Sequence, residues 1–199
     1  MSGVSAVSHA VEAVVKLGGG LLAFPDCFDA ALDAITAAAQ TVRLLVVPGG
    51  GPFADAVREV DRRWRLPDAA AHWMAVLAMD QHAHLVVARL SDGVLAEDAR
   101  GISEALEARR LPVLAPSRWL RAADPLPHSW DVTSDTIAAW ITGQVGAARL
   151  VLVKPPGASG PDLTDVYFTR ALPANVTWVV VAGDRSHDLA AALDCRPRI

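Results

Sequence analysis

The stretch VVKLGGG, residues 14–20, carries one lysine near the end of an apolar run and three glycines directly after it. A short apolar run rich in β-branched residues is typical of a buried strand. Residues 42–51, VRLLVVPGGG, show the same order of strand and glycines. Consecutive glycines lose much conformational entropy on folding, which is explained if backbone N–H groups must converge on an anion. Tight turns are the alternative interpretation, but they account poorly for two triple-glycine loops that each follow a buried strand.

Short apolar runs alternate with amphipathic segments along the rest of the chain. The pattern predicts strands at residues 13–17, 42–47, 84–90, 111–115, 150–154 and 177–181, and helices at residues 25–40, 53–64, 68–82, 97–109, 133–145 and 184–193. Residues 116–130 are predicted to be irregular. The alternation favours an α/β fold, a three-layer α/β/α sandwich with a mainly parallel central sheet. Ligands bind beyond the carboxyl ends of the strands in such sheets, where both glycine loops are expected.

Composition argues against several classes of partner. The net charge is −4 and the isoelectric point about 5.8, whereas nucleic-acid and anionic-membrane binding require a basic face. No apolar stretch reaches the roughly 18 uninterrupted residues that a membrane span needs. Cys27 and Cys195 stand at opposite ends without metal-type spacing, so we expect reduced thiols in a cytoplasmic protein. The 199 residues, 52% of them hydrophobic, suit a single compact domain.

Two common nucleotide motifs do not fit the glycine loops. Both loops match the dinucleotide pattern G-x-G-x-x-A, but that pattern also needs an acidic residue about 20 positions later for the ribose. The corresponding place after the first loop reads Val47-Pro48-Gly49, and no clear strand after the second loop ends in an acid at that distance. A P-loop needs lysine and serine or threonine after its last glycine. Lys16 precedes the glycines, so a P-loop is excluded.

Lysine is scarce in this sequence, because only Lys16 and Lys154 occur, both at the ends of predicted strands. A lysine whose stem covers apolar surface while its ammonium reaches solvent explains either one alone. The pair favours a specific role, since a compact ammonium can follow a phosphoryl group from donor to acceptor. Asp135 lies in the first turn of a predicted helix, with Thr133 or Ser134 as its N-cap. Its carboxylate is suited both to helix capping and to orienting a lysine.

Four motifs in this order, VVKLGGG, VVPGGGPFA, VTSDTIAA and LVLVK, resemble those of the amino acid kinase family, which includes aspartate, acetylglutamate, carbamate and uridylate kinases. Within the family, the blocks PGGGPFADAVREVD, AAHWMAVLAMDQ and PHSWDVTSDTIAAW are similar to those of the small kinases of methanofuran synthesis. Those kinases phosphorylate an aminomethylfuran methyl phosphate to its diphosphate. The resemblance implies the amino acid kinase fold and an ATP-dependent phosphotransferase that acts on a small phosphomonoester.

The resemblance also implies a role for each matching residue. Lys16 and Lys154 would neutralise the transferred phosphoryl group, and Asp135 would orient both lysines. The residues expected to hold the phosphates of ATP are Gly18, Gly19, Gly20 and Gly157. Those expected to bind the acceptor are Gly49, Gly50, Gly51, His128, Trp130, Thr133 and Ser134.

The family likeness further implies cofactors and assembly. Mg²⁺ is expected to accompany ATP, because phosphoryl transfer needs its negative charge shielded, and no metal site made by protein side chains is expected. A homodimer is expected. The single domain, residues 1–199, would bind the acceptor through roughly residues 1–130 and the nucleotide through roughly residues 131–199.

The segment after Lys154 departs from the family pattern. Many members continue there with threonine–aspartate–valine–aspartate–glycine, which helps to hold the nucleotide, whereas this chain reads KPPGASG. Two alternatives therefore stay open, a kinase with a carboxylate or nucleotide acceptor and a non-catalytic relative that binds a nucleotide or metabolite. In MDQHAHLV, Asp80, His82 and His84 are interpreted as surface or interface polar groups. A metal site is the alternative, because alternate histidines would share one face of a predicted strand.

Overall fold

The computed structural model describes residues 11–158 and 163–194. Its strands form one sheet in the order β3-β4-β2-β1-β5-β6, and every described strand pair is parallel. The strands are β1 (Ala13–Leu17), β2 (Leu44–Pro48), β3 (Gly93–Ala96), β4 (Leu111–Leu114), β5 (Arg149–Lys154) and β6 (Thr177–Ala182). β1 pairs with both β2 and β5. The two glycine loops follow β1 and β2, and the two lysines lie on β1 and β5. All of them are therefore found on three adjacent strands.

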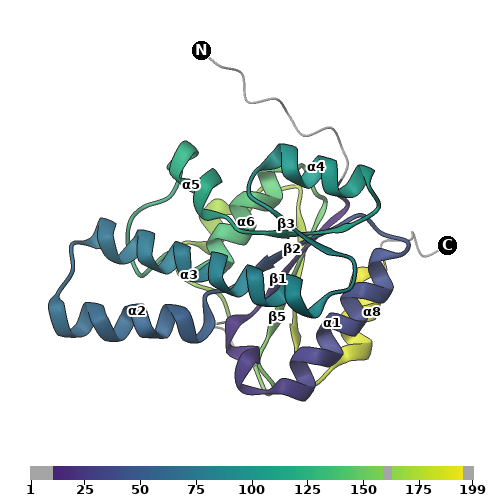
Figure 1. Cartoon of the computed structure of the whole chain (residues 1–199), viewed down its shortest axis with the longest axis horizontal. Coiled ribbons are helices and arrows are strands. Elements are labelled where there is room, and N and C mark those ends of the chain that lie inside the picture. The colour runs from purple at the N-terminus through teal and green to yellow at the C-terminus, as the bar shows by residue number, and fades with distance from the viewer. Residues whose placement is uncertain (1–10, 159–162, 195–199) are drawn as a thin grey trace, which may run out of the picture.

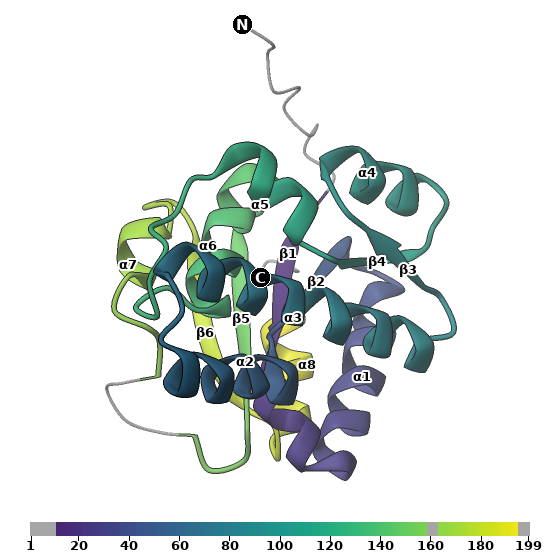
Figure 2. The ribbon, with the colours of Figure 1, turned by 60° about the vertical axis from the view of Figure 1, so that its left-hand side comes forward.

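Helices cover both faces of the sheet (Figure 1). They are η1 (Gly19–Ala23), α1 (Pro25–Ala39), α2 (Gly51–Trp64), α3 (Asp68–Arg89), α4 (Ala99–Glu107), α5 (Ser117–Ala123), α6 (Ser134–Gln144), α7 (Phe168–Ala171) and α8 (Ser186–Leu193). α1 packs beside α8, and α2 and α3 run side by side as a projecting pair (Figure 1). Figure 2 shows α6 and α7 flanking β5 and β6 on the face away from α1.

Alternate residues of the buried strands belong to two apolar cores, one on each face of the sheet. Val14 and Leu152 belong to the core under α4, α5 and α6, whereas Val15 and Val153 belong to the core under α1 and α8. Successive side chains of a strand point to opposite faces, so a sheet covered on both sides reads as a continuous apolar run. The three-layer α/β/α sandwich with a parallel sheet is thus confirmed.

The prediction of a strand at residues 84–90 is wrong, because nearly all of these residues belong to helix α3. Buried Ala83, Val86 and Leu90 recur at helical spacing, whereas His84 is exposed. A short apolar run fits a strand and a buried helix equally well. The run is apolar because α3 passes from one core to the other, its first half packing with α4–α6 and its second half with α1.

Several short elements escape the sequence pattern. β3 forms the sheet edge beside β4, and its four residues are too few for a periodic signal. α5 lies where an irregular segment is predicted, and Asp80 on α3 accepts a hydrogen bond of 3.1 Å from the Ser117 N–H at its start.

Cys27 is a half-buried free thiol, and Cys195 lies outside the described residues. Across the part of the chain that the structure describes, no helix has the length and apolarity to cross a membrane.

Candidate active site

Three charged side chains meet at the carboxyl end of the central strands. Lys16 lies on β1, Lys154 ends β5, and Asp135 lies in the first turn of α6. Lys16 Nζ is 2.8 Å from Asp135 Oδ1, and Lys154 Nζ donates to Asp135 Oδ2. The side chains of Lys16, Lys154 and Asp135 are only 6%, 15% and 4% exposed. We call this buried group the lysine–aspartate triad.

The triad holds two ammonium groups around one carboxylate. Burial alone would raise the pKa of Asp135, but the charges of Lys16 and Lys154 outweigh it and hold that pKa below its usual 3.8. Burial and the neighbouring charge of Lys16 lower the pKa of Lys154 below 10.5, and Asp135 opposes them. Buried charges are tolerated where they are paired. With every member ionised, one positive charge is left over, which suits an anionic ligand.

Helix α6 begins as the sequence predicts. Thr133 has an extended backbone and is the N-cap, with its Oγ1 accepting a 3.4 Å hydrogen bond from the Asp135 N–H. Asp135 and Thr136 in the first turn are buried. A carboxylate at this end of a helix interacts favourably with the helix dipole. Asp135 therefore serves the helix start and pairs with the lysines at the same time.

The two glycine loops touch each other. A Cβ atom at Gly19 would lie 2.1 Å from the backbone N of Gly51, and one at Gly51 would lie 2.8 Å from the carbonyl O of Gly19. Gly51 also has a φ of +53°, a conformation that favours glycine. Close approach of two backbones, rather than a turn alone, is therefore what requires glycine in both loops.

The N–H groups of the glycines divide into two sets. Gly18 donates to the carbonyl O of Val153, and Gly49 donates to that of Leu17, each at 2.8 Å, so these two amides fasten the loops to the strands. The glycines whose N–H groups donate to no described residue are Gly19, Gly20, Gly50 and Gly51. Free amides at the starts of η1 and α2 are an arrangement that binds anions.

A cavity of about 300 Å³ lies between the glycine loops, the triad and α2. The predicted site residues that line it are Lys16, Lys154, Asp135, Gly18, Gly19, Gly20, Gly50, Gly51, Trp130, Thr133 and Ser134. Gly49 lies behind the loop, through the hydrogen bond to Leu17. The cavity thus brings most residues of the expected donor and acceptor sides to one place.

Trp130 forms one wall of this cavity and contacts two residues of α2. Its Nε1–H donates to Asp61 Oδ2 on α2 at 2.8 Å. The guanidinium of Arg58 lies 4.9 Å from the centroid of the Trp130 ring and pairs with Asp55 at 2.7 Å. Asp55 and Arg58 also line the cavity. A flat apolar wall thus stands beside an exposed cation, and sequence analysis did not identify Arg58.

Two further predicted residues, His128 and Gly157, lie outside this cavity. His128 stacks on His72 with 4.4 Å between ring centroids, and its Nε2 lies 2.9 Å from Asp124 Oδ1. It therefore supports the segment that leads to Trp130 instead of lining the cavity. Gly157 lines a second cavity of about 500 Å³ together with Arg185, along β6. This second cavity lies beside β6, which pairs with β5. At the carboxyl end of these two strands, the Lys154 carbonyl accepts from the Gly183 N–H at 2.8 Å.

Asp165 is a charged residue of this region that sequence analysis missed. Its carboxylate accepts hydrogen bonds from the backbone N–H and the hydroxyl of both Thr133 and Thr136, at the start of α6. Its own segment reads Thr164-Asp165-Val166, the first three residues of the family stretch that is absent directly after Lys154. That short match, which begins ten residues after Lys154, was the available signal.

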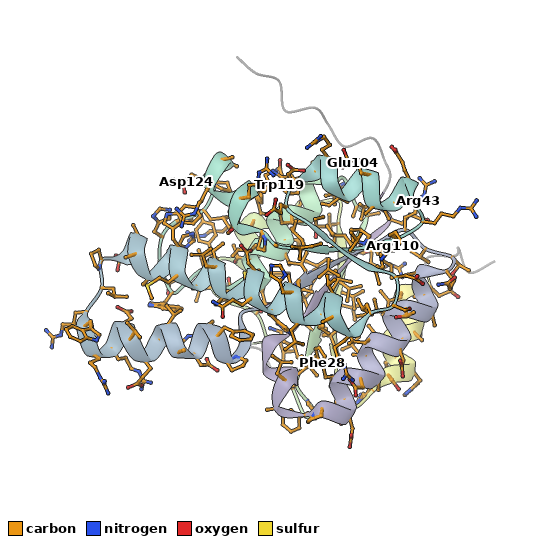
Figure 3. The ribbon with its side chains drawn as sticks, viewed as in Figure 1. Phe28, Arg43, Glu104, Arg110, Trp119 and Asp124 are labelled. Atoms are coloured by element: carbon orange, nitrogen blue, oxygen red, sulfur yellow. The ribbon has the colours of Figure 1, made fainter. Side chains whose placement is uncertain are left out.

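The suggested metal site at His82 and His84 is not formed. The two histidines lie on helix α3, with His82 buried and His84 exposed, because residues two apart on a helix point in different directions. No group of three His, Cys, Asp or Glu in residues 11–158 and 163–194 could hold a metal ion. The Nδ1–H of His82 donates instead to the carbonyl of Gly49, and its ring stacks on that of Phe28. Figure 3 labels Phe28 on helix α1. His82 therefore braces the second glycine loop from within the core.

The buried His82 gives a prediction about stability and pH. Burial lowers its pKa below 6.5, so its contribution to stability is present above pH 6.5 and is lost as pH falls through the lowered value. We expect His82→Leu to lower the free energy of unfolding by about 1–3 kcal/mol at pH 8, because the Gly49 carbonyl loses its donor. The deficit relative to the parent protein should shrink at pH 5. Urea unfolding at both pH values measures it.

The matched control is His84→Leu on the same helix. His84 is exposed, so the free energy of unfolding of this variant should stay within about 0.5 kcal/mol of that of the parent protein. It should also depend on pH in the same way as in the parent protein. A His82→Leu deficit that is the same at pH 5 and pH 8 would contradict the assigned ionisation of His82.

Comparison with known proteins identifies the family. The model of the amino acid kinase family matches residues 12–155. The [5-(aminomethyl)furan-3-yl]methyl phosphate kinase of Methanocaldococcus jannaschii is 28% identical over 144 residues, which are 70% of this chain and 63% of that protein. The chain thus spans less than two thirds of the length of this curated relative.

Two solved structures have the same fold. The uridylate kinase of Archaeoglobus fulgidus superposes with a TM-score of 0.71 at 14% identity, covering 94% of this chain and 97% of that one. The UMP kinase of Ureaplasma parvum gives a TM-score of 0.66 at 14% identity, covering 92% and 96%. With the family match over most of the chain, these findings show that the protein belongs to the amino acid kinase family.

Proposed function

We propose that the protein is an ATP-dependent kinase that transfers the γ-phosphoryl group to a small phosphomonoester. The observation that carries the proposal is the lysine–aspartate triad, which faces a cavity between two glycine loops with free amides. Phosphoryl transfer asks little covalent chemistry of a protein, and positive charge with fixed N–H donors is what its transition state needs.

Each part of the site has a role in this reaction. An oxygen of the acceptor phosphate attacks the γ-phosphorus of ATP, the bond from that phosphorus to the β-bridging oxygen breaks, and ADP leaves. Lys16 and Lys154 stabilise the charge on the transferred group, and Asp135 keeps their ammonium groups together. The amides of Gly19 and Gly20 hold the donor phosphates. Those of Gly50 and Gly51, at the start of α2, hold the acceptor phosphate.

The donor fits the residues that are present. The free amides and the excess positive charge suit polyphosphate, and the second cavity, beside Gly157 and Arg185, offers space for a nucleoside along β6. Mg²⁺ bound to the phosphate oxygens of ATP would shield their charge during transfer. This division assigns the acceptor to the α2 side and the nucleotide to the β5–β6 side, in line with the expected parts of the domain.

The acceptor that we propose is an aminomethylfuran methyl phosphate, converted to its diphosphate. Its support is the name of the Methanocaldococcus relative together with the shape of the acceptor side. The indole of Trp130 offers a flat surface to a small aromatic ring, and Arg58 beside it offers a cation to phosphate oxygens. Asp55, on the same wall, offers a carboxylate to the acceptor's amine.

A panel assay tests this function. The protein is incubated with MgATP and one acceptor at a time: an aminomethylfuran methyl phosphate, other phosphomonoesters, UMP, and the carboxylates aspartate and acetylglutamate. ADP formation and the phosphorylated product are measured. We expect turnover with the aminomethylfuran phosphate. Turnover with UMP or a carboxylate alone would show that this compound, and not the aminomethylfuran phosphate, is the acceptor. Absence of turnover with every acceptor would leave only a binding function.

The charge of Lys154 should appear in the pH dependence of the reaction. Its pKa lies below 10.5 through burial and the charge of Lys16, so kcat/KM should fall as pH rises through that lowered value. The effect of the same group on protein stability runs the other way, because stability should rise with pH where activity falls. The unfolded chain holds this proton up to about 10.5, so stability should rise between the lowered pKa and 10.5. A Lys154→Arg variant that stays active should lose the alkaline fall, and an unchanged fall would contradict the role of Lys154.

A further inference from the structure

Asp165 is the most heavily hydrogen-bonded carboxylate among the described residues. Oδ2 accepts from the Thr133 N–H at 3.0 Å, the Thr133 hydroxyl at 2.6 Å and the Thr136 N–H at 3.1 Å. Oδ1 accepts from the Thr136 hydroxyl and from the Tyr167 N–H at 3.1 Å. Thr133 and Thr136 lie 32 and 29 residues before Asp165. The carboxylate thus ties the segment between β5 and α7 to the start of α6.

The start of α6 depends on this contact. The hydroxyl of the N-cap Thr133 accepts only a long 3.4 Å bond from the Asp135 N–H, and it donates its proton to Asp165. The Thr136 N–H, which has no partner inside the helix, is satisfied by Asp165. A carboxylate at a helix N-terminus is also favoured by the helix dipole. Asp165 therefore does from a distant segment what a local capping side chain usually does.

Thr133 and Thr136 enclose Asp135 in the sequence, so the contact acts directly on the triad. Fixing the residues on both sides of Asp135 leaves its backbone little freedom, and its carboxylate must reach two ammonium groups at once. We propose that Asp165 is a positioning residue, which fixes the first turn of α6 and thereby holds Asp135 between Lys16 and Lys154. The kinetic part of this inference rests on the proposed function, whereas its structural part does not.

Asp165 also acts on Lys154 through its charge. Burial and the charge of Lys16 lower the pKa of Lys154, and the charges of Asp135 and Asp165 raise it. Within residues 11–158 and 163–194, Lys16, Asp135 and Asp165 are the charged groups that act on the Lys154 ammonium. Replacing Asp165 with asparagine removes one raising charge and loosens the hold on the other. The pKa of Lys154 should therefore fall further, a change that a role in folding alone would not produce.

The scarcity of lysine makes this measurable without any substrate. The chain contains only Lys16 and Lys154, so protein labelled with [¹³Cε]lysine gives just two side-chain signals to follow by NMR. Titration of the parent protein and of Asp165→Asn should place the Lys154 midpoint at lower pH in the variant. Asp131→Asn is the matched control, because it removes one exposed negative charge shortly before α6. It should leave the midpoint unchanged.

Kinetics supply the second readout. We expect Asp165→Asn to lower kcat about 10–100-fold with little change in the KM of the acceptor, because misplacement of the triad affects the transition state more than binding. If Asp165→Asn does not fold, Thr136→Val removes one of the donors and leaves the carboxylate in place, and a smaller fall in kcat is expected. An unchanged kcat in a folded variant would overturn the inference. If the parent protein phosphorylates no acceptor, the proposed function fails, and an unchanged Lys154 titration in Asp165→Asn still overturns the inference.

Discussion

Asp135→Asn is expected to abolish phosphoryl transfer and to destabilise the fold together. The change keeps the size of the side chain and removes the only carboxylate between two buried ammonium groups. Breaking a buried ion pair by removing one partner typically costs about 3–5 kcal/mol, because the remaining charge is left uncompensated. Turnover should fall at least about 1,000-fold, since the orientation of both lysines is lost. Urea unfolding and a single-turnover assay measure the two effects.

The pH dependence of this loss has a definite sign. The pKa of Asp135 is lowered in the folded protein, so its contribution to stability is fully present above its ordinary pKa of 3.8 and is lost as pH falls through the lowered value. The stability difference between the parent protein and Asp135→Asn should therefore be constant near neutral pH and shrink only in acid. A difference that grows in acid would contradict the ionised state of Asp135.

A compensated variant separates stability from activity. Combining Asp135→Leu with Lys16→Met and Lys154→Met removes every charge of the triad, and buried ion groups replaced by apolar side chains of similar volume are often neutral or stabilising. We expect the triple variant to recover much of the lost stability and no activity. Activity in a folded triple variant would exclude the triad from the reaction. Failure to recover stability would show that packing, and not charge, explains the loss in Asp135→Asn.

The triad shows why part of the arrangement can be read from the sequence. Lys16 and Lys154 each end a buried apolar run, and a parallel sheet brings the carboxyl ends of its strands to one edge. Asp135 follows a helix start signal, which places it at the same edge. These inferences use only local patterns and one rule of topology. The structure brings the three side chains within contact distance, and their role in catalysis stays a prediction.

The remaining features depend on contacts between distant segments. Asp165 reaches α6 across about 30 residues, and no local pattern encodes such a contact. Arg58 and Trp130 meet because α2 projects beside the segment before α6, which periodicity does not reveal. The strand wrongly predicted at residues 84–90 has a related cause. A short apolar run indicates burial, but it does not indicate whether the buried element is a strand or a helix.

Gly19→Ala is expected to disrupt the site as severely as any loss of charge. The added methyl would lie 2.1 Å from the N and 2.3 Å from the Cα of Gly51, which are backbone atoms that no side-chain rotation can move away. The loops cannot separate easily, because Gly18 and Gly49 fasten them to Val153 and Leu17 through 2.8 Å hydrogen bonds. Overpacking in a well-packed site costs about 1–3 kcal/mol and occasionally more, and a backbone clash belongs at the upper end.

Turnover in Gly19→Ala should be undetectable even where the protein folds, because separating the loops displaces the free amides of Gly19 and Gly51 from the phosphates. Gly101→Ala is the matched control. Gly101 lies in helix α4, where a Cβ atom would meet its nearest neighbours at 3.6 Å, an ordinary contact. That substitution should be neutral or stabilise the protein by about 0.4–1 kcal/mol, with full activity. Urea unfolding and ADP formation compare the two variants, and a Gly19→Ala protein with parental stability and turnover would show that the loops do not need to touch.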